Sequence, residues 1–244
     1  MKPFYVLDIE TLANSADCRG QSLIAMPNFA FVYMCDEYIR VLYGRLAVQP
    51  QINYGAAIGA STLGFWMQEA ISGNPAAAEI IQAMNADPDN GYVFEALVVK
   101  GEGVSYTKAE ANLTNLDVML KVAHMFRAIG TAPVIGNGPE FDNTIFEAAF
   151  RKIVHDESKR TDVAFPWPFW GSSSARTYKE IAMERGHYVK SLQETATSSA
   201  ETIMGVIRNY YDTDDHMMPV PNKHDPLLDA LSEAFTVKAL KRII

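Results

Sequence analysis

The sequence predicts an α/β domain in which helices flank a mixed β-sheet. Short runs rich in aromatic and β-branched residues come first along the chain, and such runs are typical of buried strands. Helical patterns, with apolar residues three and four positions apart, come later and surround one more short apolar run. Strands followed by helices around a further strand indicate a sheet that mixes parallel and antiparallel neighbours.

The chain begins with a predicted meander of three strands. Residues 4–9 (FYVLDI) form the first, and residues 29–34 and 41–48 form the next two. Residues 50–60, with Pro, Asn and several small residues, are expected to form a loop.

Two helices are predicted next, one from Ser61 or Thr62 and one after Pro75. The first should place Trp66 and Ile71 on one face. The turn-rich residues 85–105 surround a short apolar run, and the pattern leaves open an inserted strand or an irregular excursion.

The longest helical pattern covers residues 107–129, and Gly130 is a plausible stop for it. Residues 133–136 (PVIG) predict a short buried strand. A turn then leads into a helix expected from about Phe141 to Val154.

The last third of the chain mixes loops and helices. Residues 155–175 are expected to form a loop and residues 175–185 a helix. Residues 186–222 hold a Ser/Thr-rich piece and an acidic, proline-bearing loop. A final helix should begin at Pro226 and run to about Arg242, with Asp225 as its cap.

Length and composition are those of a globular protein. With 244 residues and 48% hydrophobic residues, the chain can form one domain over 1–244, with a possible inserted excursion near 85–105. No apolar stretch is long enough for a membrane-spanning helix, and the start does not read as a signal peptide. Cys18 and Cys35 have no metal-binding spacing, which favours a reducing, cytoplasmic compartment.

The net charge of −8 argues against a protein that binds nucleic acid through an overall positive charge. It leaves metal-dependent chemistry on nucleic acid open. A carboxylate cluster adds negative charge to the metal-free protein, and bound cations reverse the local sign.

Acidic residues stand at three places that could form a site. Asp8 and Glu10 end the first strand and point to the same face, where two carboxylates repel each other unless a cation lies between them. Asp142 begins a helix after a short strand, with Glu140 as a competitor. His224 and Asp229 flank the start of the last helix.

Each of these signals has a plain structural alternative. A strand can end in acids because it meets water, Asp is favoured in a first helical turn, and a His beside an acid is often part of a capping segment. In their order along the chain, however, the residues match one pattern. The sequence resembles the DnaQ-like (DEDD) 3′–5′ exonuclease superfamily, in its H-x4-D (DEDDh) subclass. The stretches that carry the resemblance are YVLDIETL, VIGNGPEFDNTIFEAAFRK and KHDPLLDALSEAFTVKAL.

The resemblance implies a ribonuclease H-like fold and a layout closest to phage-type exonucleases, hence the host cytoplasm if the chain is phage-encoded. It implies two Mg²⁺ or Mn²⁺ ions, which suit hard oxygen ligands. Glu10 would also help to hold the attacking water, and His224 would be the general base. The implied metal ligands are Asp8, Glu10, Asp142 and Asp229.

The resemblance also implies substrate contacts. Thr11 and Leu12 would contact the terminal nucleotide. Phe141 and Trp66 would stack on bases, with core packing as an equal alternative. The expected substrates are single-stranded or frayed 3′ ends, with DNA preferred and RNA as the alternative. A catalytically silent nucleic-acid-binding module is the alternative of another class, and the oligomeric state stays open.

Overall fold

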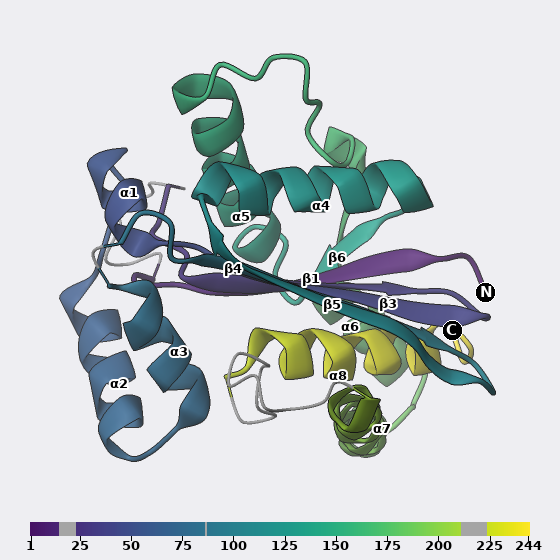
Figure 1. Ribbon diagram of the computed structural model, residues 1–244. Helices are drawn as coiled ribbons and strands as arrows, with labels where there is room; N and C mark the ends of the chain where they lie inside the picture. The colour runs from purple at the N-terminus through teal and green to yellow at the C-terminus, as the bar shows by residue number, and fades with distance from the viewer. Residues whose placement is uncertain (15–22, 86, 211–223) are drawn as a thin grey trace.

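A computed structural model describes residues 1–14, 23–85, 87–210 and 224–244. Cys18 and most of the predicted acidic loop before Asn222 lie outside these residues. Within them, seven strands form one sheet in the order β5-β4-β3-β2-β1-β6-β7, with helices on both faces (Figure 1). The predicted α/β architecture with a mixed sheet, consistent with a ribonuclease H-like fold, is confirmed.

The centre of the sheet joins the predicted meander to two parallel strands. β1 (Phe4–Glu10), β2 (Asn28–Met34) and β3 (Tyr38–Arg45) are consecutive antiparallel neighbours. β6 (Val134–Gly136) is parallel to β1, and β7 (Ser172–Ser174) is parallel to β6. The carboxyl ends of β1 and β6 therefore meet at the same edge, where α/β sheets commonly bind ligands.

A hairpin extends the sheet beyond β3. Of the two alternatives for residues 85–105, an inserted strand or an irregular excursion, the strand is the one that forms. β4 (Gly91–Val99) pairs with β3, and β5 (Gly103–Leu113) pairs with β4. The helix predicted from residue 107 is wrong up to residue 113, because those residues donate and accept the ladder hydrogen bonds of β5. The helix proper, α4 (Asn115–Ile129), starts after Thr114 and ends at Gly130.

The helical prediction for residues 46–83 is right in part. α2 (Ala60–Ile71) and α3 (Pro75–Ala83) form as expected, but Ile71 is 84% exposed and does not share the buried face of Trp66. The strand predicted to residue 48 ends at Arg45. The predicted loop begins instead with α1 (Val48–Asn53), whose proline lies in the first turn, where a missing N–H costs little.

The C-terminal half is more helical than predicted. α5 (Asp142–Phe150) continues as a π-helix over Arg151–Glu157, and a 3-10 turn spans Phe169–Gly171. α6 (Ala175–Glu184) agrees with the prediction. The Ser/Thr-rich segment forms most of α7 (Val189–Tyr210), although its composition does not predict a helix. α8 (Pro226–Leu240) begins where predicted, and the side chain of Asp225 caps it.

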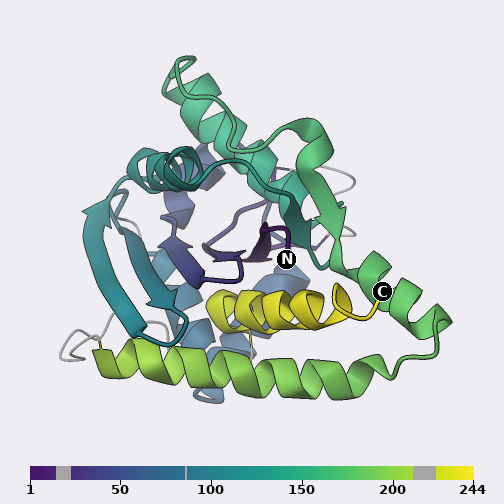
Figure 2. The same ribbon diagram turned by 90° about the vertical axis from the view of Figure 1, so that its right-hand side faces the viewer.

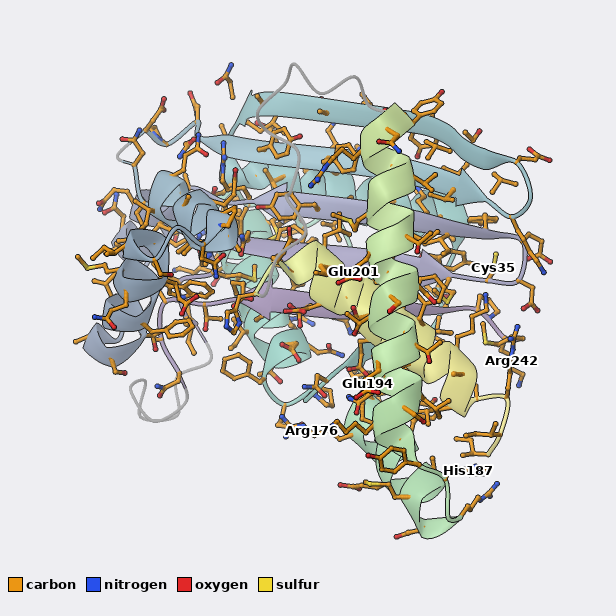
Figure 3. The ribbon with its side chains drawn as sticks, turned by 90° about the horizontal axis from the view of Figure 1, so that it is seen from below. Cys35, Arg176, His187, Glu194, Glu201 and Arg242 are labelled. Atoms are coloured by element: carbon orange, nitrogen blue, oxygen red, sulfur yellow. The ribbon has the colours of Figure 1, made fainter. Side chains whose placement is uncertain are left out.

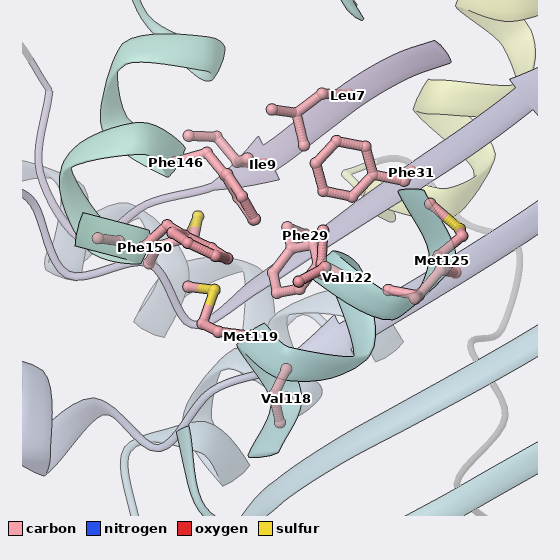
Figure 4. Packing of buried hydrophobic residues seen from close by; sticks show 14 of the residues in the cluster. Leu7, Ile9, Phe29, Phe31, Val118, Met119, Val122, Met125, Phe146 and Phe150 are labelled. Atoms are coloured by element: carbon pink, nitrogen blue, oxygen red, sulfur yellow. The ribbon is translucent and has the colours of Figure 1, made fainter. Parts of the chain in front are cut away.

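Two apolar layers hold the sheet between its helices. On one face Leu7 and Ile9 pack with Phe31 and Phe146 against α4 and α5 (Figure 4). On the other face Phe4 and Val6 pack against α8, and α7 lies alongside α8 farther from the sheet (Figure 2). None of the helices in the described part of the chain is long and apolar enough to cross a membrane.

Candidate metal centre

Strand geometry positions the first pair of acids. Side chains of β1 alternate between the two faces, so Asp8 and Glu10 continue the row that begins with Phe4 and Val6. That row faces α8. Both acids are partly exposed, because the apolar layer ends at this edge of the sheet.

A turn after β6 brings Asp142 to the same edge. Asp142 is 7% exposed in the first turn of α5, and its carboxylate accepts a hydrogen bond of 3.2 Å from the Gly138 backbone N–H. Gly136 leaves room for it, since a Cβ there would lie 3.1 Å from Asp142 Oδ2 and 2.8 Å from Asn143 Oδ1. The turn therefore fixes the carboxylate by a hydrogen bond and by close packing.

The start of α8 contributes the third part of the cluster. The buried Asp225 accepts hydrogen bonds from the N–H groups of Leu227 (2.8 Å) and Leu228 (3.3 Å), which fixes the first turn. Asp229 lies in that turn. Candidate ligand atoms of Glu10, His224 and Asp229 all lie within 4.8 Å of one another.

His224 has an unusual backbone and an aromatic setting. Its φ of +67° is in the left-handed region, which non-glycine residues seldom adopt except where the surroundings impose it. Its ring meets Phe65 and Trp66 edge to face, with centroids 5.4 and 5.9 Å apart. These rings hold the imidazole beside the acidic cluster.

The cluster is electrostatically unfavourable without a cation. Burial, and then the negative charges of Glu10, Asp142 and Asp229, raise the pKa of Asp8 well above its ordinary value. Burial and the negative charge of Asp229 do the same for the pKa of Glu10. Burial raises the pKa of Asp142 to about 6, although the hydrogen bond from Gly138 opposes the shift.

These residues fit divalent cations. All four carboxylates offer hard oxygen ligands, which Mg²⁺ and Mn²⁺ prefer. The mutual repulsion that raises the pKa of Asp8 and Glu10 is what bound cations would relieve. The structure places ligand atoms of Glu10, His224 and Asp229 within 4.8 Å of one another, and it places Asp8 and Asp142 near enough for their charges to interact with those of Glu10 and Asp229.

The competing acid near Asp142 points elsewhere. Glu140 is largely exposed and lies 3.8 Å from the guanidinium of Arg176, which is itself exposed on α6. The charge of Asp142 is among the largest that raise the pKa of Asp8, whereas that of Glu140 is not. Asp142 is therefore the better placed of the two.

The predicted substrate contacts are placed less favourably. Leu12 is fully buried and Trp66 is 2% exposed, so core packing describes both side chains in this conformation. The Trp66 Nε1–H donates to the Thr11 carbonyl at 2.9 Å and fixes that backbone beside the acids. Phe141 is half-buried against the core. The neighbouring Phe65, not singled out from the sequence, is 41% exposed next to His224.

A pocket of about 270 Å³ opens beside the acids, between the end of β1 and helices α6, α7 and α8. Asp8 and Asp229 form part of its wall. Sequence reasoning missed its other charged residues, Lys179 and Glu233. Only one signal pointed to Glu233: it follows Asp229 by four positions and so shares its face of α8. The remaining polar lining comes from Asn137, Gln193, Thr197, Ser232 and Thr236.

A comparison with family models identifies the family of the chain. Residues 4–240 match the family described as the 3'-5' exoribonuclease Rv2179c-like domain, and the chain belongs to this family. The family is part of the DnaQ-like exonuclease superfamily, so that resemblance is confirmed. The finer likeness to phage-type exonucleases has no support from the match. No curated protein and no solved structure matches the chain.

Proposed function

We propose that this member of the Rv2179c-like exoribonuclease family removes nucleotides from the 3′ end of RNA by metal-dependent hydrolysis. The observation that carries the proposal is the meeting of Asp8, Glu10, Asp142 and Asp229, from three distant parts of the chain, at one edge of the sheet. The family description names an exoribonuclease, and RNA therefore fits better than the DNA that the sequence alone favoured.

In this proposal the four carboxylates hold two divalent cations, Mg²⁺ or Mn²⁺. When bound, such ions neutralise charge on the phosphate and make water a better nucleophile. The carboxylates themselves position the ions. The turn after β6 fixes Asp142 by a hydrogen bond and by close packing.

His224 acts as the general base in the proposed reaction. Its imidazole accepts the proton of a water molecule while the water oxygen attacks phosphorus, and Glu10 accepts a second hydrogen bond from that water. The bond from phosphorus to O3′ of the preceding nucleotide breaks, that oxygen gains a proton from solvent, and the protonated His224 returns its proton to solvent. A nucleoside 5′-monophosphate leaves, and the shortened strand keeps a 3′-hydroxyl.

Residues on the α2 side of the acids are proposed to hold the terminal nucleotide. Thr11 and Leu12 directly follow Glu10, and hydrogen bonds from Trp66 to the Thr11 carbonyl and between Leu12 and the backbone of Ala25 and Gly59 fix this segment beside the acids. The exposed Phe65 of α2 offers ring surface for a base, and Phe141, at the start of α5, is a second candidate. Stacking on such rings is sequence-tolerant and contributes roughly 1–3 kcal/mol per base.

A digestion experiment tests the proposal. RNA and DNA oligomers labelled at the 5′ end, single-stranded or with a 3′ overhang, are incubated with Mg²⁺, Mn²⁺ or a chelator. We expect a ladder that shortens from the 3′ end, on RNA faster than on DNA, and only with metal. Asp142→Asn should abolish the ladder, whereas the matched control Glu140→Gln should retain it.

Other results would contradict the proposal. A ladder that persists in Asp142→Asn, or one that survives the chelator, would exclude these carboxylates as the metal site. Faster cleavage of DNA would restore the preference expected from the sequence. Binding of RNA without cleavage under any metal would favour the catalytically silent module.

A further inference from the structure

A partly buried ion pair lies at the wall of the pocket beside the acids. The Lys179 ammonium lies 2.7 Å from Glu233 Oε2 and 3.3 Å from Asn137 Oδ1. The Lys179 and Glu233 side chains are only 15% and 16% exposed. The pair joins α6 to α8 at the wall of the pocket.

One atom of this pair is left without a partner. Glu233 Oε1 is buried and has no hydrogen bond from any described residue. An unsatisfied buried acceptor costs free energy, and a carboxylate oxygen costs more than a neutral one. Glu233 lines the pocket, and a small rotation of its carboxylate would bring Oε1 to a molecule bound there, which would supply the missing hydrogen bond.

The surroundings restrict what that molecule can be. A phosphodiester brings no donor for the Glu233 carboxylate and would be repelled by its charge. A further cation is disfavoured, because Lys179 already neutralises this carboxylate. What remains is a neutral hydrogen-bond donor, and the hydroxyl and amide side chains of Ser232 and Gln193 suit a neutral polar group as well.

We infer that this pocket binds the ribose of the penultimate nucleotide and that Glu233 accepts a hydrogen bond from its 2′-hydroxyl. The inference rests on the proposed function, because it takes the scissile phosphate to lie at Asp8 and Asp229. The 2′-hydroxyl is the donor by which a protein distinguishes RNA from DNA. Glu233 is thus a specificity residue, and Lys179 orients it.

The assignment to the penultimate nucleotide follows from the two sides of the metal centre. Thr11, Trp66 and His224 flank the acids on the side of α2, where the terminal nucleotide is proposed to lie. The pocket lies on the other side, among α6, α7 and α8; Figure 3 shows α7 crossing below α8 there, with α2 and α3 on the opposite side. The sugar across the scissile phosphate from the terminal nucleotide is the penultimate one, whose O3′ is the leaving atom.

Single-atom changes in the substrate test this inference. RNA oligomers carry one 2′-deoxy or one 2′-fluoro nucleotide, at either the penultimate or the terminal position, and kcat/KM is measured for release of the first nucleotide. With wild-type protein, both penultimate changes should lower kcat/KM about tenfold, since neither hydrogen nor fluorine can donate to Glu233. The terminal changes report on a different site and serve as internal controls.

The protein variants complete the test. In Glu233→Ala, the ribo and penultimate 2′-deoxy substrates should differ by no more than about twofold, through loss of rate on the ribo substrate. This ratio does not depend on the fraction of folded protein. The amide of Glu233→Gln would present a donor instead of an acceptor. This variant should also reduce the ratio of kcat/KM between the ribo and the penultimate 2′-deoxy substrate. The control Glu180→Ala, an exposed neighbour of Lys179 that does not line the pocket, should keep the wild-type ratio.

Several outcomes would overturn the inference. If Glu233→Ala slows all substrates equally, the residue forms a structural ion pair only. If only the changes at the terminal nucleotide lower kcat/KM of the wild-type protein, the penultimate ribose does not bind in this pocket. These failures differ from failure of the proposed function, in which wild-type protein would cleave none of the substrates with any metal.

Discussion

At the scale of the residue, the metal centre depends on one small side chain. Gly136 ends β6 where the chain turns back toward Asp142 and Asn143. A methyl group there would approach the Asn143 amide oxygen at 2.8 Å, closer than carbon and oxygen normally come. The side chains of Asn143 and Asp142, or the start of α5 that carries them, would have to move, and the Asp142 carboxylate would be displaced.

We therefore expect Gly136→Ala to lower kcat/KM on RNA about 100-fold, which is typical for a displacement of about 1 Å in a reacting group. The free energy of unfolding should fall by only about 1–3 kcal/mol. Denaturant unfolding and steady-state kinetics would measure both. Gly205→Ala is the matched control: a Cβ there meets nothing within 4 Å, so the change should retain activity.

From the sequence alone, candidate site residues could be named where the residue type carries its own chemistry, and their roles as metal ligands and general base stay predictions. Acids at a strand end and an H-x4-D pair identified the five polar residues before any contact was known. The same reasoning could not find Glu233 or Phe65. Their roles depend on which side of a helix faces a pocket, and that is decided by tertiary packing.

At the scale of the element, α4 shows how local signals fix a boundary. Thr114 Oγ1 accepts a hydrogen bond from the Asp117 N–H at 3.2 Å, and the Asp117 carboxylate accepts one from the Thr114 N–H at 3.1 Å. This reciprocal cap begins the helix at residue 115. The apolar spacing alone extended it back into β5, because strand residues beside a helix can match its period by chance.

Removal of the cap should destabilise the protein without touching the metal centre. We expect Thr114→Ala to lower the free energy of unfolding by about 1 kcal/mol, which corresponds to a Tm lower by about 2–4 °C for a chain of this size. Thermal unfolding followed by circular dichroism would measure it. Thr195→Ala, on the exposed side of α7, should change the stability by less than about 0.5 kcal/mol. Unchanged Tm in Thr114→Ala would show that packing alone holds α4.

At the scale of the whole molecule, the parallel strands β1 and β6 and helix α8 converge on one acidic point. Most of the strands and helices are predictable because their apolar periods are local. Their convergence is not, because it depends on sheet order and on how the π-helix, α6 and α7 complete the C-terminal half. This arrangement is unfavourable for charged carboxylates, and the pKa values of Asp8, Glu10, Asp142 and Asp225 are raised.

Stability should therefore depend on pH and metal together. Burial raises the pKa of Asp142 to about 6 and that of Asp225 to about 7, and it raises those of Asp8 and Glu10 as well. The favourable contribution of these groups is fully present below about pH 4, where the unfolded chain also holds their protons. It is lost as the pH rises through 6 and 7, because the folded protein must then carry repelling charges.

Metal-free protein should have a higher Tm at pH 5.5 than at pH 8. Mn²⁺ should raise the Tm strongly at pH 8 and weakly at pH 5.5, because cations need ionised ligands; metal at 100 times its Kd adds about 2.7 kcal/mol. Thermal unfolding in chelator and in Mn²⁺ at both pH values measures this. Asp142→Asn should make the Tm depend less on pH and should reduce the rise in Tm caused by Mn²⁺. Glu140→Gln, on the exposed side of the turn, should preserve the pH dependence and the Mn²⁺ effect of the wild-type protein. A Tm at pH 8 that ignores Mn²⁺ would mean that the cluster does not bind the ion.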